Sequence, residues 1–224
     1  MQVEAEVKRA PADPLSAYGF SAALRSAIDR ATTRPTGLIA VAGAHAEETI
    51  ALLASELDAE PGTVDAPGAI DAAECRRVVA RAEGSDVITT ILALRRQARD
   101  RFALAATLRL VIAQRSAPGL CAECRRPMQA FGSMSALLGL DPGAILWSAP
   151  GCGACDGSGE QGRVLVFEGV EIDAAMRRLI YDGADAPLLS GHAFRSAPNF
   201  ASAARALARD GLIAPEAAVL VSRG

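Results

Sequence analysis

Four of the five cysteines form two closely spaced pairs, and this pattern constrains the fold more than any other feature of the 224-residue sequence. Cys121 and Cys124 form one Cys-x-x-Cys motif, and Cys152 and Cys155 form a second one. Zinc favours four thiolates in a tetrahedron at about 2.3 Å, and a short turn between two cysteines directs both sulfurs at one point. The pattern therefore predicts one structural zinc ion held by all four side chains, with no position left for water.

Other interpretations of the cysteines stay open beside zinc. A redox-active Cys-x-x-Cys motif usually occurs once, beside a βαβ unit, so two pairs favour metal binding. Residues 152–159 also look like one repeat of the chaperone cysteine-rich domain, Cys-x-x-Cys-x-Gly-x-Gly, which leaves a free-standing zinc-binding interaction module as an alternative. Cys75 lies outside both pairs, and we expect it to be a small buried hydrophobic residue on the inner side of a helix.

Composition and charge describe a globular chain. Half of the residues are hydrophobic and the net charge is only −3, which excludes a disordered polar segment. The longest nearly apolar run, Phe102–Ala113, is interrupted by Arg109 and is too short to span a bilayer, so we expect a cytoplasmic protein without direct membrane insertion. The acidic balance and the scarcity of aromatic residues argue against nucleic-acid binding. Lys8 is the only lysine, so no mechanism that needs a lysine can operate beyond it.

The first half of the sequence alternates between strand-like and helix-like segments. Apolar residues at helical spacing predict helices, and short apolar runs rich in β-branched residues predict buried strands. An alternation of this kind is typical of an α/β layer with parallel strands. The expected elements are a helix at Ser21–Ala31, a strand at Gly37–Gly43, a helix through Ile50–Leu57, a break at Pro61–Gly68, a capped helix from Asp71 to Ala82, a strand at Asp86–Leu92 and a long helix at Arg96–Arg115.

The second half begins with a change of composition at Pro118 and Gly119. A strand is expected at Arg163–Glu168, and short helices follow it, with Gly183 and Gly211 at positions where glycine ends helices. Those helices are expected at Asp173–Asp182, Asn199–Asp210 and Pro215–Ser222. The predicted organisation is a flexible lead-in at 1–14, an α/β region at 15–116, a zinc subdomain at 117–170 and a helical subdomain at 171–224.

Several segments, taken in order, match one family. Residues 35–43 look like the strand that leads into a phosphate-binding loop. Residues 110–115 read LVIAQR and are followed at once by Cys121-Ala-Glu-Cys124, and residues 162–168 read GRVLVFE after the second cysteine pair. Residues 176–180, with the sequence MRRLI, continue the same order. This pattern resembles the C-terminal motor domain of the assembly ATPases of type II secretion and type IV pili, in a truncated and degenerate form.

The resemblance implies a truncated RecA-like layer of the P-loop NTPase type, which makes 15–116 a degenerate nucleotide-binding region, followed by a tetracysteine zinc subdomain and a C-terminal helical subdomain. It implies protein partners in a secretion or pilus machine, either an active ATPase ring or further copies of this chain. It also implies a place at the cytoplasmic face of the inner membrane, reached through a partner.

The phosphate loop that the resemblance implies is degenerate. The family motif is GxxxxGK[ST], whereas the segment from Gly43 to Thr49 is one residue short, lacks the second glycine and has Glu48 in place of the lysine. Gly43 and Thr49 are the remaining candidates for contacts with ATP and Mg²⁺. At about 4 Å and an effective dielectric constant near 20, losing the lysine and gaining the glutamate each cost up to about 4 kcal/mol of phosphate binding.

Three further differences from the family concern catalysis. Ala69 occupies the position of the glutamate that orients the attacking water, and Leu92 that of a histidine. The stretch between Gly43 and Gly68 is also too short for the family's acidic motif with its flanking strands. We therefore expect no catalytic residues and a non-catalytic or regulatory role. The alternative is a divergent active ATPase that uses Thr49 and arginines in place of the lost groups.

The remaining polar residues are expected to have structural roles. A surface or hydrogen-bonding role is expected for His45, in the degenerate loop, and for His192, in a turn flanked by glycine. Trp147 is expected to pack beside the zinc loop, and Arg163 and Glu168 to support the fold near it. The basic cluster of Arg95, Arg96, Arg99 and Arg101 is expected to be a solvated face.

Overall fold

The computed structural model describes residues 13–63, 68–130 and 132–223. Its centre is a five-stranded sheet with the order β2-β3-β1-β4-β7. The first four strands are parallel, and β7 is antiparallel to β4 at one edge. The strands are β1 (Gly37–Gly43), β2 (Glu60–Thr63), β3 (Arg77–Arg81), β4 (Leu108–Leu120) and β7 (Glu160–Glu171).

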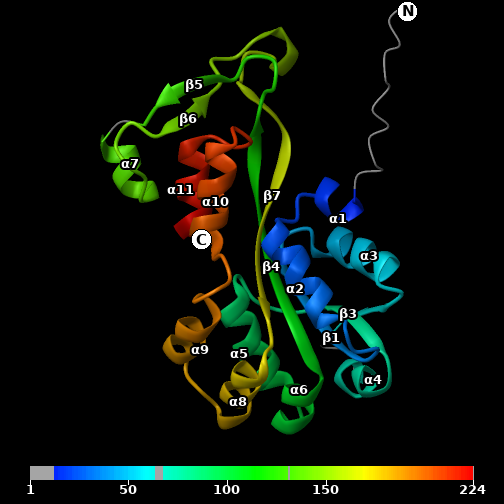
Figure 1. The fold of residues 1–224 in the computed structure, drawn as a ribbon. Helices are drawn as coiled ribbons and strands as arrows, with labels where there is room; N and C mark the ends of the chain where they lie inside the picture. Colours follow the sequence, from blue (N-terminus) through cyan, green and yellow to red (C-terminus); the bar gives the residue numbers. More distant parts are fainter. Residues whose placement is uncertain (1–12, 64–67, 131, 224) are drawn as a thin grey trace, which may run out of the picture.

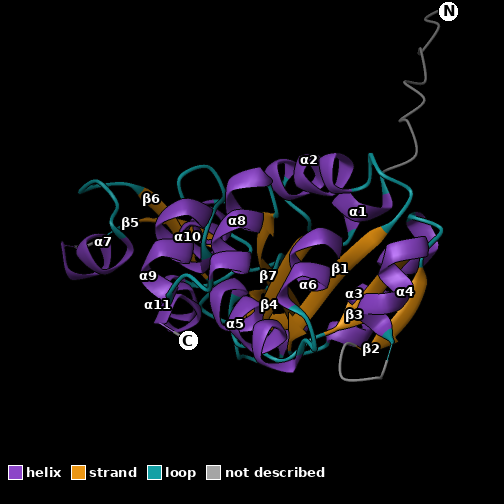
Figure 2. Cartoon of the chain, turned by 90° about the horizontal axis from the view of Figure 1, so that it is seen from below, coloured by secondary structure: helices purple, strands orange, loops and turns teal. Residues whose placement is uncertain are grey.

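The central strand β1 is buried on both faces, which explains its continuous apolar sequence. Leu38 and Ala40 face one hydrophobic core, and Ile39 and Val41 face the other. Helices cover both sides of the sheet (Figure 2). Helices α1 (Pro14–Ala17), α2 (Ala22–Ala31) and α3 (Ala46–Glu56) pack on the second core, and α4 (Ala69–Cys75), α5 (Val87–Gln97) and α6 (Arg101–Thr107) on the first.

Strands β4 and β7 form a long antiparallel ribbon that runs through the molecule and joins its lower and upper parts (Figure 1). The ribbon pairs from Leu110 with Glu171 to Leu120 with Glu160. Its upper end carries β5 (Arg126–Gln129), β6 (Ile145–Ser148), α7 (Gly132–Leu138) and a 3-10 turn at Gly153–Cys155. Helices α8 (Ala174–Asp182) and α9 (Ala186–Ala193) lie at the lower end, and α10 (Phe200–Arg209) and α11 (Pro215–Arg223) pack at the upper end.

Several predicted elements are confirmed within a residue or a few. They include α2, whose N-terminus is capped by the Ser21 hydroxyl, the strand β1 and the helices α3, α8, α10 and α11. Gly183 ends α8 in the left-handed conformation, as expected of a helix-terminating glycine. The predicted strand at Arg163–Glu168 lies within β7.

Three predicted elements of the first half are wrong. The helix predicted from Asp71 to Ala82 is α4 followed by strand β3, and Gly68, not Asp71, precedes the helix. The strand predicted at Asp86–Leu92 is the start of α5, because the Asp86 carboxylate and the Thr89 hydroxyl form a capping box. The long helix predicted at Arg96–Arg115 is α6 followed by β4.

Smaller differences concern the break at Pro61–Gly68 and His192. Residues 60–63 form the short edge strand β2, a place where the sheet tolerates Pro61, and residues 64–67 lie outside the described part. His192 belongs to helix α9 and not to a turn. The lead-in predicted at 1–14 lies almost wholly outside the described residues, and the division into regions stays a prediction.

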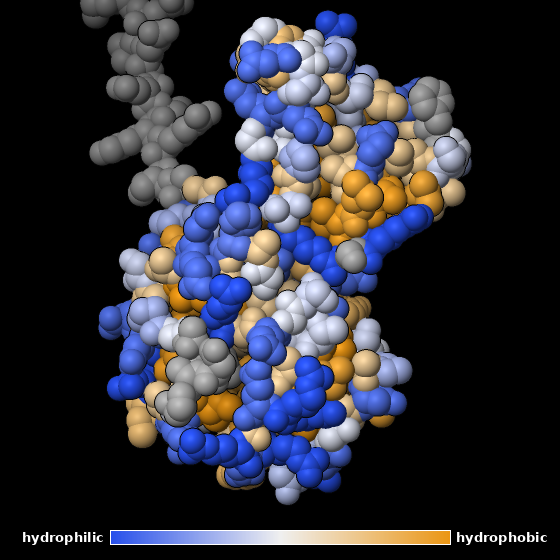
Figure 3. Space-filling model, turned by 180° about the vertical axis from the view of Figure 1, so that it is seen from behind, coloured by the Kyte–Doolittle hydropathy of each residue, from blue (hydrophilic) through white to orange (hydrophobic). Residues whose placement is uncertain are grey.

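The rear face of the molecule carries an apolar area on its upper part, over α7 and α11 (Figure 3). Leu137 on α7 and Leu220 on α11 are among the most exposed large hydrophobic residues, at 53% and 74%. None of the helices in the described residues combines the length and the apolar character that crossing a bilayer requires.

Candidate functional site

The four predicted zinc ligands converge at the upper end of the ribbon. Their sulfur atoms all lie within 4.8 Å of one another. The Sγ–Sγ distances are 3.9 Å between Cys121 and Cys152, 4.0 Å between Cys124 and Cys155, and 3.8 Å between Cys152 and Cys155. A zinc tetrahedron with bonds of about 2.3 Å has sulfur–sulfur edges of about 3.8 Å. The cluster therefore has the dimensions of a four-thiolate metal site.

Backbone amides surround the Cys155 sulfur in the way that metal-bound thiolates require. The N–H groups of Cys152 and Gly159 both donate to Cys155 Sγ at 3.2 Å. The hydrogen bond from the Cys152 backbone N–H is the largest of the effects that lower the pKa of Cys155, which falls to about 6. Gly159 has φ +74°, and a Cβ there would overlap the Ala149 carbonyl, so only glycine brings this amide to the sulfur.

Cys124 is also buried. Burial raises the pKa of Cys124 to about 12, so this thiol holds its proton unless a cation compensates the negative charge. A divalent ion among the four sulfurs would supply that compensation, because metal binding releases thiol protons. The residues present thus fit a metal ion, and a soft four-sulfur tetrahedron suits zinc.

The loop after β1 is where the resemblance places the phosphates. Strand β1 ends at Gly43 and α3 begins at Ala46, so only Ala44 and His45 connect them. Phosphate-binding loops use several successive backbone N–H groups to surround the anion. A two-residue turn is too short to form that cradle. His45 adopts the left-handed conformation, with φ 61°.

Thr49, the proposed remnant of a Mg²⁺ ligand, is completely buried. Its hydroxyl donates to Gln114 Oε1 at 2.5 Å and also pairs with the Tyr18 hydroxyl at 3.1 Å. The Gln114 amide donates in turn to the Ala44 carbonyl. Gly43 packs against the Gln114 backbone so closely that a Cβ would overlap it. The Thr49 hydroxyl is therefore engaged within the protein, and Gly43 is packed against the backbone of Gln114.

The first turn of α3 contains two acidic residues. A helix that binds an anion would instead present free backbone N–H groups in its first turn. Glu47 is paired with Arg81 at 2.8 Å, and Glu48 lies 3.4 Å from Arg163. These carboxylates interact favourably with the positive end of the helix dipole. A phosphate group approaching the same helix end would meet two negative charges.

The other positions singled out by sequence do not form a catalytic group. Ala69 is the first residue of α4, and Leu92 lies in the middle of α5. The comparison of Leu92 with the family's histidine comes from the resemblance of residues 89–92 to a family segment and stays a prediction. His192 accepts and donates within a local network, with Nε2 3.0 Å from Asp173 and Nδ1 2.7 Å from Arg195.

Glu168 and Trp147 both make structural contacts, but those of Glu168 lie at the start of α5 and α10 and not at the zinc loop as expected. Glu168 is buried in β7, and its two oxygens accept the N–H groups of Val87 and Phe200 at 2.9 Å. Trp147 Nε1 donates to the Arg209 carbonyl at 3.0 Å, which ties β6 to α10. Tyr18 and Gln114, which bond to Thr49 and to the turn after β1, were not identified from the sequence. Gln114 could have been suspected, because it is a glutamine that directly follows the buried run of a central strand.

Cys75 is exposed, which corrects the expectation of a buried side chain. Cys75 is the last residue of the short helix α4, and the chain continues as strand β3 from Arg77. The expectation of a buried Cys75 assumed a longer helix that the structure does not contain. The basic cluster is partly confirmed as a solvated face. Arg96, Arg99 and Arg101 are exposed, whereas Arg95 is half-buried and donates to the Ala184 carbonyl.

Comparison with known proteins identifies relatives. A family model described as type II/IV secretion system protein matches residues 77–219. Type II secretion system protein E of Pseudomonas aeruginosa is 34% identical over 126 residues, which cover 55% of this chain and 25% of that protein. The type IV pilus assembly ATPase PilB of Myxococcus xanthus is 28% identical over 116 residues, covering 50% and 20%.

A solved structure of the pilus retraction motor PilT with bound ADP aligns with a TM-score of 0.57 and 17% identity, over 88% of this chain and 64% of that one. The likeness shows that this is an α/β protein with the fold of the secretion and pilus ATPases. The chain belongs to the type II/IV secretion system protein family, since the family model covers well over half of it. It spans about a quarter or less of the length of these two curated relatives.

Proposed function

We propose that this protein is a non-catalytic or regulatory relative of the type II secretion and type IV pilus assembly ATPases, with a structural zinc site and without a working phosphate loop. In this proposal it contributes no catalytic residue, binds Zn²⁺ through Cys121, Cys124, Cys152 and Cys155, and does not depend on ATP or Mg²⁺. Gly43 and Thr49 are remnants of a nucleotide site.

The proposal rests above all on the two-residue turn between β1 and α3. Nucleotide binding would need a longer loop, free amide donors and a basic side chain. The segment offers instead a buried Thr49 hydroxyl and two carboxylates in the first helical turn. Glu48 is 56% exposed and lies near Arg163, so solvent reduces its repulsion of phosphate below the 4 kcal/mol limit estimated from sequence.

Zinc has a structural purpose in this proposal. The cysteine cluster contacts few apolar side chains, with Ala149 and Cys152 as its partly buried neighbours. Metal binding contributes about 10–16 kcal/mol in small zinc modules, enough to fold a segment with so little hydrophobic core. The ion would join the upper ends of β4 and β7 and so define the zinc region proposed at 117–170, between the regions at 15–116 and 171–224.

The proposed partners are proteins of a secretion or pilus machine, in particular an active ATPase ring of the same family or further copies of this chain. The proposed location is the cytoplasmic face of the inner membrane, reached through such a partner. Support comes from the relatives, which are named as secretion and pilus assembly proteins.

The test combines an activity assay with a mixing experiment. Zinc-loaded protein is assayed for phosphate release from ATP, with an active secretion ATPase from the same organism as the positive control. The protein alone should release no phosphate above background. When it is mixed with the active ATPase, it should change the rate of that enzyme or co-purify with it. Phosphate release by the protein alone, retained after a second purification step, would overturn the proposal in favour of a divergent ATPase.

A further inference from the structure

A small polar pocket lies at the end of β1 opposite the degenerate loop. Its volume is about 150 Å³, and four arginines contribute to its lining, from α2, the α2–β1 connection, β4 and α8. They are Arg30, Arg34, Arg109 and Arg177. This concentration of positive charge is unexpected in a protein with a net charge of −3.

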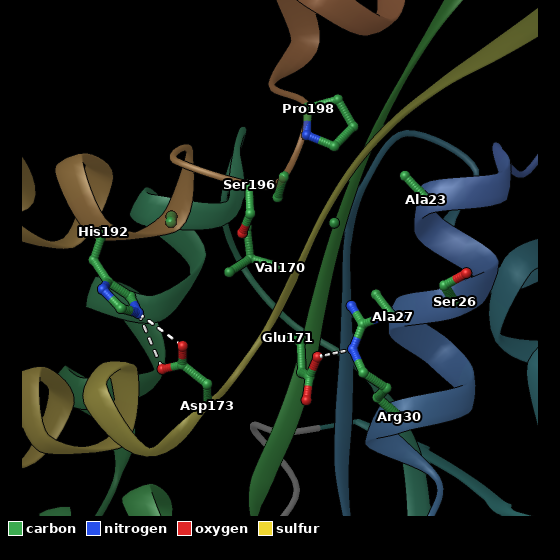
Figure 4. A pocket seen from close by; sticks show the side chains of 13 residues that line it. Ala23, Ser26, Ala27, Arg30, Val170, Glu171, Asp173, His192, Ser196 and Pro198 are labelled. Carbon is green, nitrogen blue, oxygen red and sulfur yellow. Dashed lines mark hydrogen bonds and ion pairs between the residues drawn. The ribbon is translucent and has the colours of Figure 1, made fainter.

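The two carboxylates of the pocket are already engaged. Glu171 accepts from Arg30 Nε at 2.6 Å, and Asp173 lies 3.0 Å from His192 Nε2 (Figure 4). Asp173 also accepts the N–H of Met176, which helps to keep its pKa below the usual value. Among the described residues, no ion pair is found for the other three arginines. The pocket therefore contains more positive charge than its own carboxylates neutralise.

Arg109 is the most buried of the four arginines, with 9% of its surface exposed. Its Nη1 donates to the Ala106 and Leu108 carbonyls, but its buried Nε has no hydrogen-bond partner in the described part of the chain. Gly37 makes room for this side chain, since a Cβ there would overlap it.

The surroundings of Arg109 disfavour its positive charge. Burial is the main cause that lowers its pKa, and the nearby charges of Arg34 and Arg177 add to this effect. Like charges are normally kept apart or neutralised, because each close pair costs free energy at low dielectric constant. An anion in the pocket would remove this repulsion.

We propose that the pocket formed by Arg30, Arg34, Arg109 and Arg177 binds a phosphate group. Guanidinium groups offer paired N–H donors that match the oxygens of phosphate, and such charge-assisted hydrogen bonds are about twice as strong as neutral ones. The volume of about 150 Å³ suits a phosphate group rather than a whole nucleotide.

The neighbouring cavity gives room for the rest of a phosphate ester. That cavity has a volume of about 280 Å³ and shares Arg30, Glu171 and Asp173 with the arginine pocket. Small side chains of α2 line one side, among them Ala23 and Ser26, and Figure 4 shows α2 on the opposite side of β7 from the α8–α9 segment. A phosphomonoester can thus place its phosphate among the arginines and its organic group in this cavity.

The competing explanation is that the arginines serve only as donors to carbonyl groups. Arg109 contacts the end of α6, and Arg177 Nη1 donates to the Ile172 carbonyl at 3.2 Å. This explanation does not account for Arg34, because its side chain is exposed and only its backbone carbonyl, which accepts from Arg77, has a partner among the described residues. Arg34 is therefore the residue whose substitution separates the two explanations.

The direct test is calorimetric titration of the zinc-loaded protein with inorganic phosphate, at an ionic strength held constant with sodium chloride. Constant ionic strength removes general screening effects. We expect saturable binding that Arg34→Gln weakens about tenfold, the effect of losing one charge-assisted hydrogen bond. Arg126→Gln is the matched control, because Arg126 is an exposed arginine of the distant strand β5. It should bind like the wild type.

A second arm identifies the source of the phosphate group. In this arm the protein is sedimented with phosphatidic acid vesicles. If Arg34→Gln reduces the sedimented fraction and Arg126→Gln does not, the pocket is assigned to a lipid headgroup. Phosphate binding without sedimentation would assign it to a soluble phosphate ester. Absence of both, or equal binding by the Arg34 and Arg126 variants, would overturn the proposal.

Discussion

Glu168 is the buried carboxylate that links three elements of this fold, and its replacement by glutamine gives a sharp prediction. It is 3% exposed in β7. One oxygen accepts the N–H of Val87, the first residue of α5, and the other accepts the N–H of Phe200, the first residue of α10. Both bonds are 2.9 Å long, so the carboxylate satisfies two helix N-termini that lie far apart in the sequence.

The expected magnitude follows from the lost acceptor. Glutamine has the shape of glutamate but only one oxygen, so in Glu168→Gln one of the two buried N–H groups faces an amide NH₂. A buried donor without a partner costs about 1–3 kcal/mol. A protonated glutamate retains two oxygens that can accept, so this figure applies where Glu168 is neutral. A loss of about 1–3 kcal/mol is a substantial part of the total free energy of unfolding, which is usually about 5–15 kcal/mol.

The pH dependence has a defined sign. Burial raises the pKa of Glu168 above its ordinary value of 4.5, so the folded state binds the proton more tightly than the unfolded state. Its contribution to the free energy of unfolding is thus complete below pH 4.5 and falls as the pH rises through the raised pKa. Glutamine has no proton to release, so the destabilisation by Glu168→Gln should be larger at pH 4 than at pH 7.

Urea unfolding of both proteins at pH 4 and pH 7, followed by circular dichroism, measures this effect. Glu160→Gln is the control, because Glu160 is an exposed glutamate of the same strand. A Glu168 variant as stable as the control at pH 4, or a loss of stability that grows with pH, would refute the reasoning.

Three further predictions concern the zinc site, the closed loop and the arginine pocket. Metal analysis should find one zinc per chain in the wild type and far less in Cys155→Ser, while Cys75→Ser should keep its zinc; equal metal content in both variants would contradict the four-cysteine site. Thr49→Val should lower the free energy of unfolding by about 1–3 kcal/mol, because Gln114 Oε1 loses its buried donor, and unchanged urea midpoints would argue against that network. Gly37→Ala should lower thermal stability through a strain of about 1–3 kcal/mol or more, since φ is +136° and Arg109 occupies the space; a melting temperature like that of the wild type would contradict this packing.

The elements that sequence reasoning found are those with a clear boundary signal. The Ser21 cap and the apolar spacing of Leu24 and Ile28 define α2, and the glycines that flank 37–43 define β1. The errors share a physical cause. Strand β4 is buried on both faces at this point, so the apolar run at Leu110–Ala113 fits a helix and a strand equally well. In α5, a capping box outweighed the strand preference of the β-branched residues.

The candidate sites were predictable to different degrees. Two short motifs were enough to bring four cysteines together, because each fixes the position of two sulfurs and only one tertiary contact is then needed. The contacts that Gln114 and Tyr18 make with Thr49 join β4 and the end of α1 to α3, and no local pattern specifies them. The pocket around Arg109 likewise brings together residues from four separate segments of the sequence.

The central claim is that the loop after β1 no longer binds nucleotide, and calorimetric titration with ATP and Mg²⁺ tests it most directly. Wild type and Arg34→Gln are titrated side by side in a phosphate-free buffer, so that binding at the arginine pocket is not mistaken for binding at the loop. The account predicts that folded, zinc-loaded Arg34→Gln shows no saturable heat up to about 1 mM ATP, a concentration at which a micromolar site would be saturated. Micromolar binding of ATP by this variant, lost on removal of Mg²⁺, would contradict the account and restore the enzyme interpretation.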